Sequence, residues 1–252
     1  MNPRKPEQPA PETTGKKVMV TNLSGNVGKS LIARHLLAPR MANAEVYVVE
    51  TVNAGASDDA PGAERMRGRD FGTLQEAMMV ASSAIVDVGA SNVEQFLQGM
   101  RQYSGSQEDF DLFVVPVTPE KKQQIDTINT VKTLAGLGVE PARIVVIFNK
   151  VDSDDGADLS AIFPAIFGFY EEEKLFTLKP AVAIYLNEVY DRLRPLRRTV
   201  SDLLTDGRDY RQELRDNKDS DERERLMALV SAKRLAVSAH RNLSDVFRAI
   251  FG

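Results

Sequence analysis

Residues 18–30 read VMVTNLSGNVGKS, and this stretch decides the fold. Its apolar first part is typical of a buried strand, and a helical pattern begins at Ser30. In such a strand–loop–helix, backbone N–H groups and the helix N-terminus bind phosphate oxygens. Lys29 is placed to reach the β- and γ-phosphates, and the Ser30 hydroxyl to ligate Mg²⁺. The stretch predicts a phosphate-binding loop whose nucleotide contacts are Gly25, Asn26, Val27, Gly28, Lys29, Ser30 and Leu31.

Strand and helix patterns alternate beyond this loop. Apolar runs that suit strands buried on both faces are Val18–Leu23, Glu45–Glu50, Ala84–Gly89, Leu112–Thr118 and Arg143–Lys150. Helical patterns lie between them at Ser30–Leu37, Phe71–Ala81, Val93–Gln102 and Glu120–Leu137. This alternation predicts a doubly wound α/β domain, with a mostly parallel sheet and helices on both faces.

Composition narrows the function classes. The 252 residues carry a net charge of −4, with no cysteine and only two histidines. Disulfides, thiolate metal sites and cysteine nucleophiles are excluded, and a histidine-based metal site is disfavoured. The sequence has no run of the roughly 18 apolar residues that a membrane span needs. We expect a cytoplasmic protein, with the nucleoid as a candidate location.

Three regions are expected along the chain. Residues 1–16 are rich in proline and predict a disordered tail, residues 17–190 the nucleotide-binding domain, and residues 191–252 a helical extension packed on it. Within the domain, Asn53–Asp70 is long and polar, and it predicts a mobile functional loop.

Two acids at strand ends are candidate catalytic residues beside Lys29. Asp87 ends the apolar run Ala84–Gly89, where a carboxylate can hold Mg²⁺ through its water shell. Gly89 allows the next loop to approach the γ-phosphate. Glu50 ends another strand and is a candidate to position the attacking water, although a solvated strand-end glutamate explains it nearly as well.

The loop resembles the deviant Walker A box of the ParA/MinD family of P-loop ATPases. The matching residues are Asn22, Gly25, Val27, Gly28, Lys29 and Ser30. More narrowly, NxSGNVGKS and the helix ending at 35–40 resemble the StbB-type plasmid stability proteins. The resemblance implies ATP with Mg²⁺, an ATPase acting in plasmid stability, partition or DNA positioning, and a plasmid-encoded DNA-binding partner.

Two positions depart from that family. Ser24 stands where the family has a lysine that crosses a dimer interface to the partner's nucleotide, and Asn26 replaces a glycine. A homodimer is therefore expected to be weak or to use another surface, and hydrolysis to be slow. Arg65, Arg67 and Arg69 are candidates to replace the missing charge.

The base is expected near the end of the run Arg143–Lys150. By the same resemblance, Asn149 would contact adenine, and Pro180 would begin a last strand, Ala181–Leu186, beside the base. Asn149 to Asp152 also match the NKxD pattern by which GTPases read guanine. A regulatory GTPase that binds GTP is therefore an alternative to the ATPase.

The C-terminal region suggests further partners. Arg192, Arg194, Arg197 and Arg198 are candidates for DNA phosphate contact, although a charged run is usually a solvated helix face. An apolar stripe of Leu243, Val246, Phe247, Ile250 and Phe251 indicates either a helix docked on the domain or a MinD-like weak membrane contact. A nucleotide-dependent assembly switch without turnover is the remaining alternative.

Overall fold

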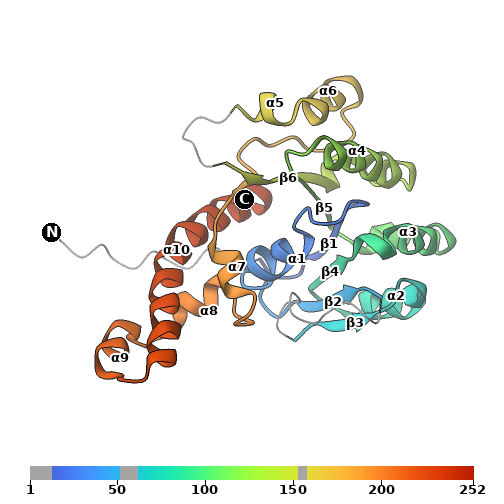
Figure 1. Ribbon diagram of the computed structural model, residues 1–252. Helices are drawn as coiled ribbons and strands as arrows, with labels where there is room; N and C mark the ends of the chain where they lie inside the picture. Colours follow the sequence, from blue (N-terminus) through green and yellow to red (C-terminus); the bar gives the residue numbers. More distant parts are fainter. Residues whose placement is uncertain (1–12, 52–61, 153–157) are drawn as a thin grey trace.

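The computed structural model describes residues 13–51, 62–152 and 158–252, and most of the predicted disordered tail lies outside these ranges. A single sheet of seven parallel strands crosses the domain in the order β3-β2-β4-β1-β5-β6-β7 (Figure 1). The strands are β1 (Lys17–Thr21), β2 (Glu45–Val49), β3 (Glu64–Met66), β4 (Ala84–Val88), β5 (Leu112–Val117), β6 (Ile144–Val151) and β7 (Ala183–Tyr185). The predicted doubly wound α/β fold is confirmed.

The central strands are apolar because both faces of the sheet are covered. Along β1, Met19 belongs to one core while Val18 and Val20 belong to the other, which is the alternation of a strand between two layers. All five residues of β4 are buried, including Asp87. The chain reverses its winding beside β1, so a crevice opens at the carboxyl ends of the strands.

Helices form a layer on each face (Figure 1). On one face lie α2 (Phe71–Val80), α3 (Val93–Gln102), α4 (Lys121–Gly136), α5 (Leu159–Ile162) and α6 (Pro164–Glu173). The other face is covered by α1 (Lys29–Leu31), its continuation η1 (Ile32–Leu37) and the last turns of α10 (Ser220–Phe251). Short 3₁₀ turns are η2 (Gly68–Asp70), η3 (Ala90–Asn92), η4 (Ser106–Asp109) and η5 (Pro141–Arg143).

The first helix departs from a regular α-helix. After three α-helical residues it widens to π-type hydrogen bonding over η1, and the N–H of Ala38 donates to the carbonyl of Ala33 at 2.9 Å. Every residue of η1 is buried, including Arg34 and His35. The helix that begins at the phosphate loop therefore carries two buried basic side chains, both of which contact the extension.

The second half of the predicted loop Asn53–Asp70 is ordered, so that prediction was wrong there. Residues 52–61 lie outside the described ranges. Glu64–Met66 pairs with β2 in parallel, and the N–H of Glu50 donates to the carbonyl of Met66 at 3.0 Å. Met66 alone of the three is buried, so a three-residue edge strand left almost no apolar signal in the sequence.

The C-terminal region is built around a third core. After α7 (Val189–Leu193) come α8 (Val200–Thr205), α9 (Tyr210–Asp216) and the long α10, with α9 at the far end of the molecule (Figure 1). Leu193, Leu203, Tyr210 and Leu226 pack together there. The first residue of α7 already belongs to this core, so it starts before residue 191.

The apolar stripe of the last helix is buried under the sheet. Leu243, Val246 and Phe247 are at most 1% exposed and pack with Val18 and Val20 of β1. Ile250 and Phe251 are partly buried against the same core. The predicted membrane contact through this stripe is therefore wrong as stated, because its side chains already fill the core. Within the described residues, no helix is long and apolar enough to cross a bilayer.

Phe247→Ala should destabilise the protein, because Phe247 is 1% exposed and its ring lies 4.5 Å from that of Phe251. We expect a loss of roughly 3–5 kcal/mol in the free energy of unfolding, measured by urea denaturation. Val237→Ala on the exposed face of the same helix should change it by about 0.5 kcal/mol or less. Equal losses in the two variants would contradict the docking of α10.

Candidate functional site

The loop between β1 and α1 is shaped by two left-handed residues. Asn26 has a φ of 59° and Gly28 a φ of 94°. At Gly28 a Cβ atom would lie 2.1 Å from Nδ2 of Asn149. Only glycine fits that position, and the tight turn brings the backbone N–H groups of Lys29 and Ser30 to the start of the helix. The loop therefore has the shape of a phosphate cradle.

The loop is held by side chains from β1 and α4. Nδ2 of Asn22 donates to the carbonyl of Pro116 at 2.8 Å and to Oγ1 of Thr127 at 2.7 Å. Oδ1 of Asn22 accepts from the N–H of Ser24 at 2.7 Å, and Oγ1 of Thr130 accepts from the N–H of Leu23 at 3.1 Å. These bonds satisfy buried polar groups and fix the loop before any ligand arrives.

Lys29 is buried within the loop. Its side chain donates to the carbonyls of Ser24 at 2.7 Å and Asn22 at 3.3 Å. Burial lowers the pKa of Lys29 to about 8, and the charges of Asp87 and Glu50 oppose that shift. Because burial penalises the charged form of Lys29, its ammonium group is suited to bind an incoming anion.

The two predicted acids lie at neighbouring strand ends. Asp87 of β4 pairs in register with Val20 of β1 and with Val48 of β2. At Gly89 a Cβ atom would lie 2.9 Å from Cγ of Glu50 and 3.1 Å from the carbonyl of Val49. Gly89 therefore allows the loop after β4 to lie directly against Glu50. The structure brings Asp87 and Glu50 to Lys29, as their influence on its pKa shows.

The residues present fit Mg²⁺ bound together with a phosphate ligand. Ser30 offers a hydroxyl and Asp87 a carboxylate, the oxygen donors that Mg²⁺ prefers. Among the described residues, no group of three or more acidic, histidine or cysteine side chains could hold a metal alone. A cation here would need phosphate or water oxygens to complete its coordination, which is how Mg²⁺ is usually held in nucleotide sites.

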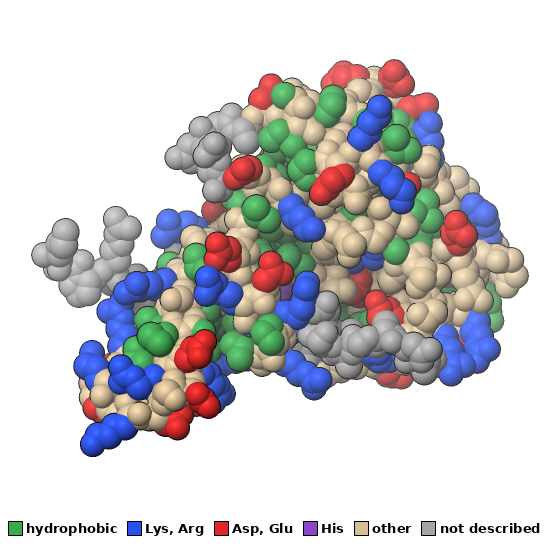
Figure 2. All heavy atoms as spheres, in the orientation of Figure 1, with side chains coloured by type: hydrophobic (Ala, Val, Ile, Leu, Met, Phe, Trp, Pro, Cys, Tyr) green, Lys and Arg blue, Asp and Glu red, His purple; other side chains and the backbone are tan. Residues whose placement is uncertain are grey.

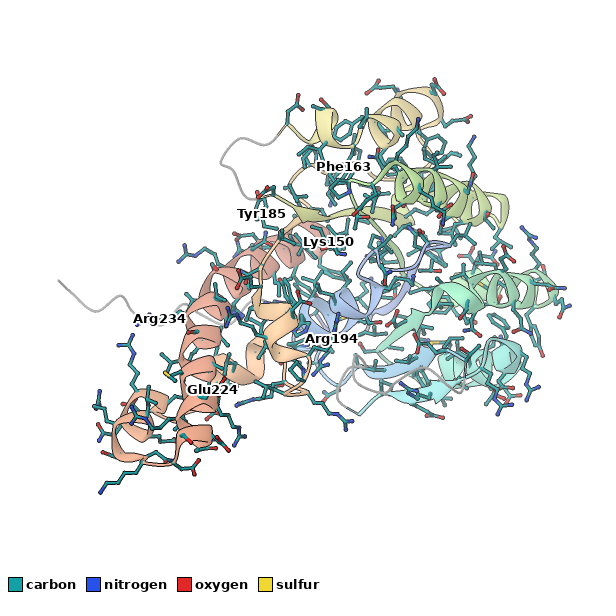
Figure 3. The ribbon with its side chains drawn as sticks, in the orientation of Figure 1. Lys150, Phe163, Tyr185, Arg194, Glu224 and Arg234 are labelled. Carbon is teal, nitrogen blue, oxygen red and sulfur yellow. The ribbon has the colours of Figure 1, made fainter. Side chains whose placement is uncertain are left out.

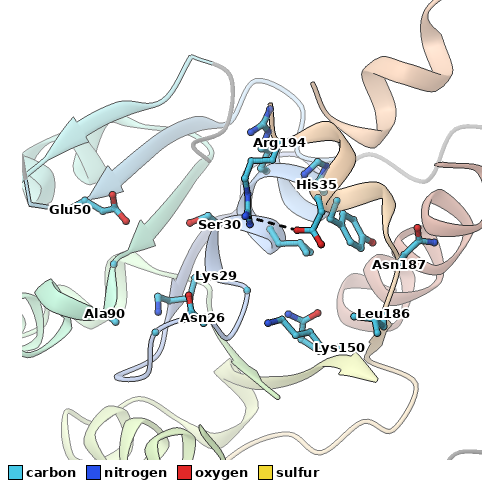
Figure 4. Close-up of a pocket in the computed structure, with 18 of the residues that line it drawn as sticks. Asn26, Lys29, Ser30, His35, Glu50, Ala90, Lys150, Leu186, Asn187 and Arg194 are labelled. Atoms are coloured by element: carbon cyan, nitrogen blue, oxygen red, sulfur yellow. Dashed lines mark ion pairs between the residues drawn. The ribbon is translucent and has the colours of Figure 1, made fainter. Parts of the chain in front are cut away.

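Asn149 has a structural part in the site that the sequence did not predict. It is 1% exposed, and its Nδ2 donates to the carbonyl of Val27 at 2.8 Å. The register between β6 and β7 shifts between Phe148 and Val151, and Lys150 adopts a φ of 55°. This irregularity places Asn149 under the loop, and Lys150 joins it in the lining of the adjacent cavity (Figure 4).

The cavity measures about 870 Å³ and opens beside the loop, a volume suited to a nucleotide-sized ligand. Six of the predicted nucleotide contacts, Gly25, Asn26, Gly28, Lys29, Ser30 and Leu31, line it together with Glu50. Gly89, expected near the γ-phosphate, also lines it. The rest of the lining comes from η1, from the segment after β4, from the end of β7 and the residues after it, and from α7 and the residue after it. Sequence reasoning did not place these residues in the site: Arg34, His35, Ala90, Ser91, Tyr185, Leu186, Asn187, Tyr190, Asp191 and Arg194. Figure 3 shows Lys150 and Tyr185 near the ends of β6 and β7, with Arg194 on α7.

Three predicted nucleotide contacts do not line the cavity. The Val27 side chain is fully buried, and its carbonyl accepts from Asn149. Pro180 precedes β7, which runs parallel to β6. It therefore lies toward the amino ends of the strands, whereas the cavity lies at their carboxyl ends. Asp152 is exposed and is not among the lining residues. The end of β7, with Tyr185 and Leu186, takes the place expected of Pro180.

The four arginines predicted to contact DNA are used differently from one another. Arg198 bonds to Tyr210 at 2.8 Å and Asp206 at 2.7 Å, and a DNA contact would break that network. Arg192 pairs with Glu188 at 2.9 Å, whereas Arg194 lines the cavity. Figure 2 shows acidic and basic side chains mixed over the protruding end of the extension. No uniformly basic face appears in that view.

The cradle, the buried lysine and the strand-end acids on a parallel sheet are the arrangement of a P-loop α/β fold. Apo McdA from Cyanothece aligns over 86% of this chain and 98% of its own, at a TM-score of 0.51 and 15% identity. This chain therefore shares the fold of McdA, a doubly wound α/β fold with a phosphate loop after its first strand.

Two further structures align more weakly. MinD with Mg-ADP from Pyrococcus horikoshii OT3 aligns over 85% of this chain and 93% of its own, at a TM-score of 0.46 and 11% identity. A putative plasmid partition protein from Borrelia burgdorferi B31, bound to AMPPNP, aligns over 87% of this chain and 98% of its own, at a TM-score of 0.42 and 11% identity. No protein-family model matches the chain, and no curated protein matches it significantly.

Gly28→Ala should damage the loop, because its φ of 94° is unfavourable for alanine and the added methyl group would collide with Asn149. We expect a loss of roughly 2 kcal/mol or more in the free energy of unfolding. Gly25→Ala is the matched control, since a Cβ atom there meets nothing within 4 Å. If both variants unfold at the same urea concentration, the described loop geometry is wrong.

Lys29 should make the stability of the ligand-free protein pH-dependent. Its pKa is about 8 in the folded protein and 10.5 ordinarily, so between these values the unfolded state binds more protons. Stability should therefore rise with pH across this window, by on the order of 2–3 kcal/mol. Lys29→Met should lack this rise. A constant difference between the two proteins from pH 7 to 10.5 would contradict the burial of the charge.

Proposed function

We propose that this chain binds ATP with Mg²⁺ and hydrolyses it slowly. The observation that carries the proposal is the place of Lys29, which is buried in the loop and donates to the loop carbonyls of Asn22 and Ser24. The cradle offers N–H groups and one ammonium to an anion, while the cavity beside it has room for the rest of a nucleotide.

Each residue has a part in this proposal. Lys29 holds the β- and γ-phosphates and stabilises charge that develops during transfer. Ser30 and Asp87 would hold Mg²⁺, which supplies charge neutralisation on the phosphates when bound. Glu50 orients the attacking water, and Gly89 allows the adjacent loop to come close to it. Asn149 supports the loop from beneath and also lines the cavity.

ATP is proposed over GTP because the guanine-reading pattern is incomplete in space. That pattern requires a carboxylate at Asp152 to meet the base, yet this residue does not line the cavity. The string 231–233, which resembles a second GTPase motif, lies in the middle of α10. A regulatory GTPase remains the alternative that a competition experiment separates.

The biological role is proposed from the resemblance of the loop to StbB-type proteins. We infer action in plasmid stability, partition or DNA positioning, with a DNA-binding partner and a weak homodimer. The fold is compatible with this role, and it narrows the direct DNA candidates, because Arg198 is bound within the extension.

An assembly switch with negligible turnover is a second candidate. Ser24 brings no charge to the loop, and its carbonyl holds the Lys29 ammonium at 2.7 Å. The ammonium group of Lys29 must leave this carbonyl before it can bind the γ-phosphate and stabilise the charge that develops there. Such a site would bind the nucleotide and turn it over slowly or not at all.

Lys29→Ala should abolish binding of a fluorescent ATP analogue, or weaken it by at least about 100-fold, because the charge-assisted contact to the phosphates is lost. Lys122→Ala is the control, since this lysine is on α4, 83% exposed and paired only with Asp126. Circular dichroism checks that both variants fold. Unchanged affinity in Lys29→Ala would overturn the proposal.

The same titration separates the alternatives. Competition with unlabelled ATP and GTP should favour ATP in the wild type, and Asp152→Ala should leave ATP affinity unchanged. Strong GTP binding that Asp152→Ala removes would establish the GTPase instead. Phosphate release measured beside binding then distinguishes an ATPase from a switch that only binds.

A further inference from the structure

One wall of the cavity comes from the extension. Tyr190, Asp191 and Arg194, from α7 and the residue that follows it, line the cavity together with the phosphate loop. Figure 4 shows Arg194 close to Ser30. The extension is thus part of the nucleotide site, although its helices form a separate core.

Two buried basic residues fasten the extension to the helix that begins at the loop. Nδ1 of His35 accepts the N–H of Val200 at 3.2 Å, and the His35 ring meets Tyr190 edge-to-face at 5.3 Å. Nη2 of Arg34 donates to the carbonyl of Arg198 at 3.3 Å. These contacts fall on both sides of Arg194, so its backbone is held at a fixed place beside the cradle.

A third contact ties the end of the same helix to α10. Arg40 is buried, and its guanidinium donates to the carbonyls of His35 and Leu36 and to Oγ of Ser244 at 3.2 Å. The helix from Lys29 to Leu37 is therefore anchored to the extension along its length.

The charges around the cavity suit a polyphosphate, and the extension adds to them one cation, Arg194, and one carboxylate, Asp191. The lining contains four cations, Lys29, Arg34, Lys150 and Arg194, and two carboxylates, Glu50 and Asp191. Burial and the neighbouring Arg34 lower the pKa of His35 to about 3, so His35 adds no charge. A nucleoside triphosphate bound with Mg²⁺ carries about two negative charges, which this lining balances.

Arg194 is the lining arginine placed to move. Arg34 is 3% exposed and bonded to the extension. The side chain of Arg194 is 58% exposed and lies 3.9 Å from Asp191, a distance at which an ion pair contributes little (Figure 4). Phosphate oxygens offer the guanidinium a charged, two-pronged acceptor instead.

The three arginines that the sequence offered in place of the missing family lysine do not lie at this cavity. Arg65, Arg67 and Arg69 are exposed near the edge strand β3, and none of them lines the cavity. Ser24 is buried and contributes only its backbone carbonyl to Lys29. Within the described part of the chain, the extension is the one element outside the sheet domain that brings a cation to the cavity.

We propose that Arg194 binds the polyphosphate of the nucleotide in cis, leaving Asp191 when the nucleotide enters. The extension thereby completes the site within one chain, because contacts on both sides of Arg194 already hold α7 beside the loop. This inference rests on the proposed nucleotide function and adds a binding residue that the loop motif does not contain.

The test compares Arg194→Ala with Arg192→Ala. Arg192 is in the same helix, exposed, and paired with Glu188 outside the cavity, so it is the matched control for charge and helix content. Affinities for ATP, ADP and AMP are measured with Mg²⁺ by calorimetry. Arg194→Ala should weaken ATP binding about tenfold or more, ADP binding less and AMP binding hardly at all, while Arg192→Ala stays within about twofold.

Two further variants separate a phosphate contact from a structural one. Arg194→Lys keeps the charge and should recover part of the ATP affinity. Asp191→Asn removes a carboxylate that competes for Arg194 and should bind ATP more tightly than the wild type. Thermal unfolding of each ligand-free variant verifies that the extension remains folded.

Three outcomes would overturn the inference. Equal affinities for ATP in Arg194→Ala and Arg192→Ala would remove Arg194 from the site. Equal losses for ATP and AMP would place its contact at the nucleoside end rather than the polyphosphate. A wild-type protein that binds no nucleotide would refute the proposed function itself, which distinguishes that failure from failure at Arg194 alone.

Discussion

The close approach of Gly28 and Asn149 is the constraint on which the site depends. A Cβ atom at Gly28 would lie 2.1 Å from the Asn149 amide, and that amide donates to the carbonyl of Val27 at 2.8 Å. One contact thus joins the loop after β1 to the end of β6, two strands away in the sheet. The bulge that brings Asn149 under the loop also accompanies the left-handed backbone of Lys150. Loop shape and cavity wall therefore arise from the same irregularity.

The second constraint is the burial of positive charge. Lys29 is 7% exposed and is held by two loop carbonyls, and burial lowers its pKa to about 8. The charges of Asp87 and Glu50 offset only part of the effect of burial on this pKa. The ligand-free cradle is therefore less stable than the same backbone would be with a neutral side chain. An anion that replaces water around Lys29 removes this penalty, so the energy spent on folding the empty site becomes available for binding.

The sequence predicted what short-range pattern can encode. Continuous apolar runs located the five inner strands, and the strand–loop–helix located the loop whose residues Lys29 and Ser30 line the cavity with Glu50. It failed where long-range packing decides. β3 has a single buried residue and gave no pattern. Because β7 runs parallel to β6, Pro180 lies toward the amino ends of the strands and Tyr185 lies at the cavity. The role of Asn149 depends on the irregular pairing of β6 with β7, and the contribution of α7 to the cavity depends on how the extension docks. Neither feature produces a periodic pattern in the sequence.

The extension changes how the loop should be understood. A phosphate loop with a single lysine is usually completed by charges from elsewhere, because one ammonium cannot balance a triphosphate. Here the buried Arg34 and His35 project from the loop's own helix and hold the segment on either side of Arg194. Two buried basic residues in a helix core are expensive unless they satisfy distant groups, and both do so by bonding to the backbone of the extension. Their burial is best explained as the means by which the helices of the extension are kept in register with the candidate nucleotide site.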